Sequence, residues 1–274
     1  MFQVQAKRTT KTAAAFAMLE VIYHATVRSI RKTHRNALLG LFINMLQTMM
    51  LVAVFYVMFA VLGLRGSAVR GDFLIYIMSG IFLYITHTKT MAAIVGSEGP
   101  ASPMMQHAPM STFVSISSAA LGALYMQVLS AVAVLFIYHV AVRPVEFLDP
   151  AGVMGMLILA WFSGVAVGMV FLAIKPWFPQ FSNIASTIYA RANMIASGKM
   201  FLANTLPFTM LKMFDWNPLF HIIDQARGFA FINYNPHYSS ISYPLTVSFV
   251  LLMLGFMGES YTRKHVSLSW SAGR

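Results

Sequence analysis

The chain contains no cysteine among its 274 residues, which excludes a disulfide framework, a thiolate metal site and a cysteine nucleophile. Charged residues are also scarce, at 10% of the sequence against about 25% in an average soluble domain. So few charges cannot cover a water-soluble surface. Hydrophobic residues reach 58%, with a mean hydropathy of +0.68. The composition therefore predicts a polytopic membrane protein and argues against a soluble enzyme.

Motifs of several enzyme and carrier classes are missing as well. No G-x-x-x-x-G-K-[ST] stretch occurs, so the chain alone has no phosphate-binding loop for ATP. The eight histidines are scattered without an H-E-x-x-H pair, so no metal site is predicted. All eight carboxylates fall in loops or at predicted span ends, whereas an ion-coupled carrier needs ionisable groups inside the membrane. A membrane-embedded hydrolase needs paired carboxylates or an oriented Ser/His set, and neither is found.

The few charges are biased toward lysine and arginine. The 19 basic residues against eight acidic ones give a net charge of +11, and seven of the cations precede Asn36. Basic ends that flank apolar spans follow the positive-inside rule. We therefore expect both termini in the cytoplasm and an even number of spans. Nucleic-acid binding is not expected, because the basic ends lack a folded face with aromatic or helical readout elements.

Residues 1–35 are predicted to form a cytoplasmic tail followed by an amphipathic helix. Cations occupy one side of this helix, and apolar residues recur at helical spacing on the other. The apolar positions are Phe16, Leu19, Ile22, Tyr23, Val27 and Ile30. The pattern suits a helix in the cytoplasmic headgroup layer, with its cations near anionic lipid. The same pattern serves a helix packed on a partner protein, and the two interpretations are compatible. A signal peptide is not predicted, because no apolar run with a cleavage site follows the basic start.

Six transmembrane helices are predicted within residues 36–262. A bilayer core of about 30 Å needs roughly 20 apolar residues of helix. The predicted spans are about 37–64, 73–97, 112–142, 152–174, 180–198 and 243–260. Gly164 and Gly168 form a small-residue pair of the kind that lets helix backbones approach closely. The fold class is thus an all-α membrane domain, followed by a cytoplasmic tail over residues 263–274.

The segment 199–242 is too apolar for an exposed loop and too interrupted for a span. Its interruptions are Pro207, Asp215, Pro218, Asp224, Arg227 and Pro236. The pieces Phe208–Phe214 and Pro218–Phe231 are predicted to be short helices that dip into the outer leaflet. Irregular backbone at membrane depth needs protein or a water-filled cavity around it, so this re-entrant segment is expected to line or close a pathway. The alternative is an ordinary extracellular cap.

Arg191 is the charge that is predicted to lie deepest in the membrane. A fifth helix that begins near Gln180 places Arg191 about 16 Å along the helix, near the bilayer midplane. Asn183 and Thr187 fall on much the same face, and Lys199 follows one or two turns later. A charge at that depth usually faces a bundle interior or an aqueous cavity. The stripe predicts either a basic wall for an anionic substrate or a structural arginine that is held by an ion pair or by carbonyl groups.

Aromatic residues are plentiful in the first two predicted spans. Sugars stack on aromatic faces, and Tyr76 and Tyr84 are the candidates that we single out for such contact. The alternative role for these tyrosines is membrane-interface anchoring or helix packing.

One stretch carries a family resemblance. Trp216-Asn217-Pro218-Leu219-Phe220-His221-Ile222-Ile223-Asp224-Gln225-Ala226-Arg227 resembles the W-N-P-[LM]-x-[HY]-[LIV]-[LIV]-[DE]-x-x-R stretch of type 2 ABC exporter permeases, in particular capsular polysaccharide and O-antigen export permeases. The basic N-terminal helix, the proline-rich first cytoplasmic loop and the broken segment before the last span are also similar, as are Phe178-Pro179 and the stretch from Ser197 to Pro207. Leu202-Ala203 departs from the aromatic-Pro pair that is usual in the family.

The resemblance implies a homodimer in the bacterial inner membrane, with each copy docked on a cytoplasmic nucleotide-binding ABC subunit that carries ATP and Mg²⁺. It implies no cofactor in this chain, and a periplasmic adaptor and outer-membrane polysaccharide channel as further partners beside membrane lipid. The expected substrate conduit is lined by Asn183, Thr187, Arg191, Lys199, Tyr76 and Tyr84. The expected outer gate comprises Asn217, Pro218, His221, Asp224 and Arg227. The expected contacts to the ATPase subunit are Arg28, Arg31, Glu98, Pro100, Pro103 and His107.

The leading hypothesis is therefore the permease subunit of an ATP-driven exporter of an acidic surface polysaccharide. We expect no catalytic site in this chain, which would be part of an ATP-hydrolysing translocase complex. A permease of the same architecture for a lipid, teichoic acid or drug is the nearest alternative. A non-transporting membrane scaffold or assembly protein is the alternative from another class.

Overall fold

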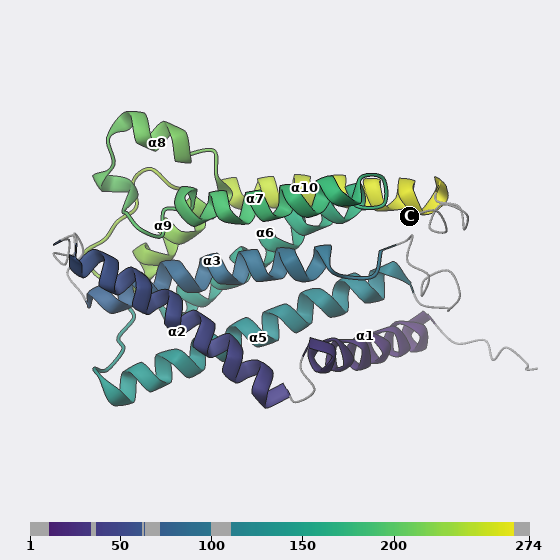
Figure 1. Cartoon of the computed structure of the whole chain (residues 1–274), viewed down its shortest axis with the longest axis horizontal. Helices are drawn as coiled ribbons and strands as arrows, with labels where there is room; N and C mark the ends of the chain where they lie inside the picture. Colours follow the sequence, from purple (N-terminus) through teal and green to yellow (C-terminus); the bar gives the residue numbers. More distant parts are fainter. Residues whose placement is uncertain (1–10, 34–36, 62, 64–71, 100–110, 266–274) are drawn as a thin grey trace, which may run out of the picture.

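A computed structural model describes residues 11–33, 37–61, 63, 72–99 and 111–265. These residues form nine α-helices and one short 3-10 helix, with no strand among them (Figure 1). The long helices are α1 (Lys11–Thr33), α2 (Ala37–Val61), α3 (Phe73–Val95), α5 (Thr112–Ala141), α6 (Pro150–Ile174), α7 (Pro179–Ala196) and α10 (Ser242–His265). The shorter ones are η1 (Ala203–Thr205), α8 (Phe208–Phe214) and α9 (Pro218–Ala230). Pro100, Pro103 and His107 lie outside the described residues, as does the side chain of Arg31.

Polar residues at the helix starts fix where several helices begin. Asp72 caps α3 by accepting a hydrogen bond from the Leu74 backbone N–H at 3.0 Å. Asp149 caps α6 in the same way, and Pro150 occupies the first helical position, where its missing N–H costs nothing. Ser111 caps α5 through the Val114 N–H. These caps lie where the apolar runs begin in the sequence.

Side-chain contacts give the direction of each long helix. α2 and α3 are antiparallel, because Asn44 near the start of α2 contacts Lys89 near the end of α3, whereas Phe59 near the end of α2 contacts Phe73 at the start of α3. The Asp72–Tyr138 and Glu98–Ser115 hydrogen bonds make α3 and α5 antiparallel too. The contact His87–Ser163 is followed along both helices by Ile94–Gly168, so α6 is parallel to α3. Likewise Phe162–Phe249 is followed by Met169–Gly255, so α6 is parallel to α10. The Tyr84–Ala190 and His87–Tyr189 hydrogen bonds make α7 antiparallel to α3. Hence α2, α5 and α7 run one way, and α3, α6 and α10 run the other.

Glycines allow the central helices to pack unusually closely. A Cβ atom on Gly164 would lie 2.5 Å from the His87 carbonyl oxygen, and one on Gly168 would lie 2.8 Å from Ile94 Cβ, so this pair brings α6 against α3. On the other side of α6, a Cβ atom on Gly255 of α10 would lie 2.5 Å from Met169 Cβ. Small residues at such positions are typical of helix contacts in membranes.

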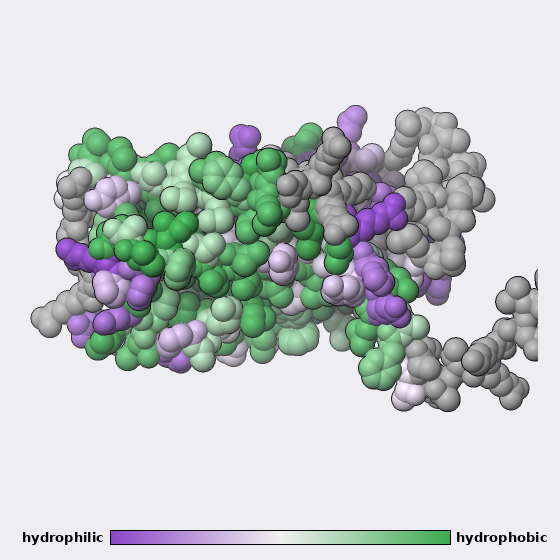
Figure 2. All heavy atoms as spheres, turned by 90° about the horizontal axis from the view of Figure 1, so that it is seen from below, coloured by the Kyte–Doolittle hydropathy of each residue, from purple (hydrophilic) through white to green (hydrophobic). Residues whose placement is uncertain are grey.

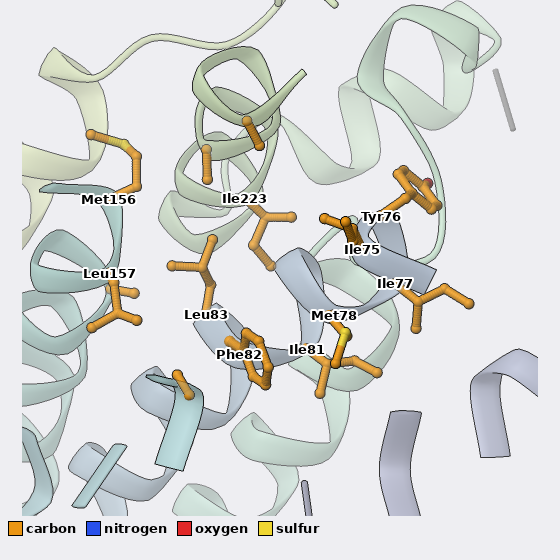
Figure 3. Close-up of a cluster of buried hydrophobic side chains, with 14 of the residues drawn as sticks. Ile75, Tyr76, Ile77, Met78, Ile81, Phe82, Leu83, Met156, Leu157 and Ile223 are labelled. Carbon is orange, nitrogen blue, oxygen red and sulfur yellow. The ribbon is translucent and has the colours of Figure 1, made fainter. Parts of the chain in front are cut away.

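The core centres on α3. Fifteen of its residues are buried, and the apolar ones between Ile75 and Ile85 belong to the main cluster together with side chains of α2, α5, α6 and α9. Figure 3 labels members of this cluster from α3, α6 and α9. Ile81, Ile222 and Ile223 are among its most buried members, at 1% exposure or less. The centre of the bundle is therefore α3 itself, although its sequence is less apolar than that of several outer helices.

Among the described residues, four helices are long and apolar enough to cross a membrane: Leu38–Val61, Thr112–Ala141, Pro150–Ile174 and Ser242–His265. The predicted spans at α3 and α7 are not among the four. α3 carries His87, Lys89 and several threonines, of which His87, Thr86 and Thr90 are buried in the bundle interior. α7 has only 18 residues and carries a polar stripe. Figure 2 shows apolar side chains over the middle of the surface in that view and hydrophilic ones toward its ends.

The broken segment before the last helix folds into short helices at one end of the bundle (Figure 1). The predicted pieces Phe208–Phe214 and Pro218–Phe231 correspond to α8 and to α9, which ends at Ala230. α9 is mostly buried and packs against α3 and α6. α8 lies outside it and keeps mainly exposed side chains.

Candidate functional site

A polar groove follows α7 where it lies beside the second half of α3. Asn183, Thr187 and Arg191 line this groove, and all three side chains are exposed. The groove has a volume of about 550 Å³ and includes Thr88 of α3 and Lys175. Two cations and no carboxylate line it among the described residues, so the predicted stripe forms one positively charged surface.

The sequence of α7 explains why this stripe is presented to the outside. Residues four apart lie on one face of a helix, which puts Asn183, Thr187 and Arg191 in a row. A second exposed row is apolar, with Ile184 at 60% and Ile188 at 61% exposure. The third side packs on the bundle through buried polar residues, including Ser182, Ser186 and Asn193. α7 thus offers a polar row and an apolar row next to each other on the outer surface of one chain.

Lys199 lies apart from this row, inside the bundle. Its side chain is 3% exposed, and its Nζ lies 3.7 Å from the centre of the Tyr84 ring and 4.6 Å from that of Phe55. Within the described structure this Nζ has no hydrogen-bond partner, so the two ring faces are its main electrostatic contacts. The Tyr84 hydroxyl donates to the Ala190 carbonyl oxygen at 3.1 Å. Tyr84 and Lys199 therefore join α2, α3 and the end of α7.

Polar residues of α9 form a buried row that ties the surrounding loops together. Asn217, His221, Asp224 and Arg227 are each 4% exposed or less. They are spaced by four, three and three residues, which keeps them on one side of the helix. Every residue of the predicted outer gate other than Pro218 belongs to this row. Pro218 occupies the first turn of α9, where Asn217 is the cap.

The first half of the row attaches α9 to its flanking segments. Asn217 Oδ1 accepts from the Leu219 N–H at 3.0 Å, and its Nδ2 donates to Asn193 Oδ1 and to the Ala196 carbonyl at the end of α7. His221 Nδ1 accepts from the Ser240 N–H at 3.1 Å. Its Nε2 is therefore the protonated nitrogen and donates to the Asp215 carbonyl at 2.7 Å.

The second half of the row holds the loops on either side of α8 and α9. Asp224 accepts hydrogen bonds from the Tyr234 hydroxyl and, at 2.7 Å, from the Ser239 hydroxyl. Burial and the Asp224 carboxylate raise the pKa of Tyr234, so its hydroxyl stays protonated. Arg227 donates to the carbonyls of Gly198, Phe201 and Lys199 at 2.9, 2.7 and 2.6 Å. Its guanidinium also lies 4.2 Å from the centre of the Tyr76 ring.

Two glycines that the sequence reasoning did not assign to the site make this arrangement possible. Gly198 ends α7 with a φ of +73°, in the left-handed region that favours glycine, and a Cβ there would lie 2.7 Å from Phe220. A Cβ on Gly80 would lie 2.9 Å from Lys199 Cβ and 3.0 Å from Arg227 Nη2. A glycine directly after a helix is the one sequence signal that could have marked this turn.

The predicted contact surface for an ATPase subunit lies at the opposite end and is described only in part. α1 packs against α5 near Gly122, where Ile30 and Ser29 approach closely, and Arg28 is exposed. The Glu98 backbone N–H donates to Ser115 Oγ at 3.1 Å. Two hydrogen bonds link α10 to its neighbours at this end of the bundle. Buried Glu259 accepts from Thr112 Oγ1 at 2.6 Å, and Trp177 donates to Thr262 Oγ1 at 3.0 Å.

The fold and its surface define an all-α membrane protein. No family model matches the chain, and a search of curated proteins finds no match either. No group of three or more His, Asp or Glu side chains that could hold a metal occurs in the described part of the chain. The groove along α7 and the buried row on α9 are therefore the features on which a function can be argued.

Proposed function

We propose that the bundle crosses the membrane six times, with α3 and α7 as spans in addition to the four strongly apolar helices. The helix directions support this. α2 and α5 run the same way, so if both cross the membrane the chain between them must return across it, and α3 is the helix that runs back. The same reasoning applies to α7 between α6 and α10. Segment 199–242 then forms a re-entrant layer at the outer end.

The function supported best is that of the permease subunit of an ATP-driven ABC exporter for an acidic surface polysaccharide in a bacterial inner membrane. The observation that carries this proposal is the groove beside α7, whose lining holds Lys175 and Arg191 and no carboxylate. An extended groove with cations, amide and hydroxyl groups suits a hydrated anionic polymer better than an apolar drug. Because the sequence lacks a phosphate-binding loop, a separate cytoplasmic subunit would supply the ATP hydrolysis.

The groove opens on the outside of a single chain, which favours a pathway shared between two copies. Exposed Ile184 and Ile188 lie beside the polar row and would pack against lipid or against the second copy. In a homodimer with α7 near the symmetry axis, the polar rows of the two copies, each with its Arg191, would face one conduit. Lys199 and Tyr84 would then support this wall from inside, and Tyr76 would support the buried row of α9.

The α9 row fits a rigid outer layer more closely than a moving gate. Asn217, His221, Asp224 and Arg227 all bind backbone or side-chain groups of neighbouring loops, and all are buried. In this proposal the resemblance to the Trp216–Arg227 stretch of exporters reflects a shared need to hold irregular backbone at membrane depth.

Cysteine labelling tests the groove directly, because the chain has no cysteine of its own. Thr187→Cys places the only thiol in the groove, and Ile188→Cys places it on the adjacent apolar row at nearly the same depth. A water-soluble maleimide needs the thiolate, which forms in water and not in lipid. In membranes we expect Thr187→Cys to be labelled at least tenfold faster than Ile188→Cys. Equal slow labelling of both would contradict an aqueous groove.

Partnership with an ATPase is tested separately. We expect the tagged chain, expressed with its neighbouring genes, to co-purify with a nucleotide-binding subunit and to change that subunit's rate of ATP hydrolysis. A preparation of this chain alone that hydrolyses ATP, or one that never retains such a subunit, would refute the proposal.

A further inference from the structure

A second polar cavity, of about 330 Å³, lies between α1, α2, α3 and α5 and shares no lining residue with the α7 groove. Its polar lining includes Asn44 and Gln47 of α2, Lys89 of α3 and Gln127 of α5. Small and apolar side chains such as Ile43 form the rest of the wall. Binding sites for small molecules typically span about 300–1,000 Å³, so the cavity can hold a headgroup-sized ligand.

The cavity presents hydrogen-bond donors. Lys89 Nζ donates to Asn44 Oδ1 at 2.9 Å and also to Gln47 Oε1. These bonds occupy the amide oxygens, so the N–H groups of the two amides are the atoms that can donate to a ligand. Gln127 Nε2 lies 3.4 Å from the same Asn44 oxygen. Asn44 is 6% exposed, and its Nδ2 has no hydrogen-bond partner in the described structure. A buried donor without a partner is costly, so this cluster is incomplete without an acceptor.

The charge of the lining specifies what kind of acceptor fits. Lys89 is the one charged residue among the described lining residues, so the cavity carries a positive charge that no carboxylate neutralises. An anion with several oxygens can accept from the ammonium group and from amide N–H groups at once. Phosphate is the common biological group with that shape and charge.

The position of the cavity indicates where such a phosphate comes from. Lys89 lies six residues before the end of α3, about 9 Å from it, near the end of the bundle where α10 carries Arg263 and Lys264. Exposed apolar residues of α1, including Phe16 and Leu19, flank this end. A bilayer that surrounds the bundle would place its headgroup layer here.

We propose that this cavity binds the phosphate group of an anionic phospholipid of the adjacent leaflet. The lipid completes the hydrogen bonding of Asn44 and Lys89 and connects α1 to the three helices behind it. This site is independent of any polymer that passes along α7.

The test measures phosphatidylglycerol binding to the purified, delipidated full chain by native mass spectrometry. We expect Lys89→Ala to weaken the tightest bound phosphatidylglycerol by about tenfold or more, as loss of a charge-assisted hydrogen bond implies. The matched control, Lys264→Ala, removes an exposed cation at the same end of the bundle and should change affinity less than twofold. Phosphatidylcholine should bind at least tenfold more weakly than phosphatidylglycerol.

A second variant keeps the test decisive if Lys89→Ala does not fold. Asn44→Asp has nearly the same shape and keeps an oxygen for Lys89, but it adds a negative charge that repels phosphate. We expect it to retain the parent melting temperature and to lose the tight phosphatidylglycerol. Unchanged binding in Asn44→Asp, equal binding of phosphatidylcholine, or displacement of the lipid by inorganic phosphate at equal concentration would each overturn the proposal.

Discussion

Replacement of Arg227 by alanine should destabilise the outer end of the bundle far more than loss of an exposed arginine. Its guanidinium donates to three carbonyl oxygens at 2.6–2.9 Å and is 1% exposed. Each charge-assisted hydrogen bond contributes about 1.5–3 kcal/mol, and the contributions of one side chain are not additive. Since the variant also leaves buried carbonyls without a donor, we expect a loss of about 4 kcal/mol in the free energy of unfolding.

Thermal unfolding of the detergent-solubilised chain measures this loss. At roughly 2–4 °C per kcal/mol for a chain of this size, Arg227→Ala should melt about 8–16 °C below the parent. Arg227→Lys keeps the charge but cannot form the planar fork, so its melting temperature should fall between the two. Arg143→Ala removes an exposed arginine from the turn after α5 and should shift the melting temperature by about 2 °C at most. A melting temperature for Arg227→Ala as high as that of Arg143→Ala would refute the structural role.

Two further substitutions test the packing at either end. Gly198→Ala should lower the free energy of unfolding by at least about 2 kcal/mol, because the residue has a φ of +73° and an added Cβ would lie 2.7 Å from Phe220. The control Gly155→Ala, where an added Cβ meets nothing within 4 Å, should be neutral or slightly stabilising. Equal melting temperatures of the two variants would contradict this prediction. Thr112→Val removes the donor to buried Glu259 and should speed amide hydrogen exchange in the first turn of α5, and unchanged exchange there would show that the contact does not hold the helix end.

Much of the helical layout follows from local sequence signals. Long apolar runs predicted α2, α5, α6 and α10, and the pair Asp149-Pro150 marks the start of α6 by its capping chemistry. The two short helices of the broken segment were predicted within one residue, because Pro207 and Pro218 delimit them. Local rules suffice here, since capping and proline geometry act within a few residues.

The contacts of the buried cations could not be predicted from the sequence. Lys199 lies against Phe55 and Tyr84, which are more than 100 residues away along the chain. Arg227 donates to backbone carbonyl groups. Every residue has such a group, so the sequence contains no signal that identifies which residues accept these hydrogen bonds. The row from Asn183 to Arg191 was visible as a spacing of four, but its exposure depends on how α7 packs against α3.

Export of the surface polymer in cells that depend on this chain is the most direct test of the proposed conduit. Arg191→Glu reverses one of the two charges in the groove, whereas Arg191→Lys keeps it; because Arg191 is exposed, neither change should alter the amount of folded protein. We expect Arg191→Lys to export at least half as much polymer as the parent and Arg191→Glu to export less than a tenth. Normal export by Arg191→Glu would contradict the account that an anionic polymer passes along α7.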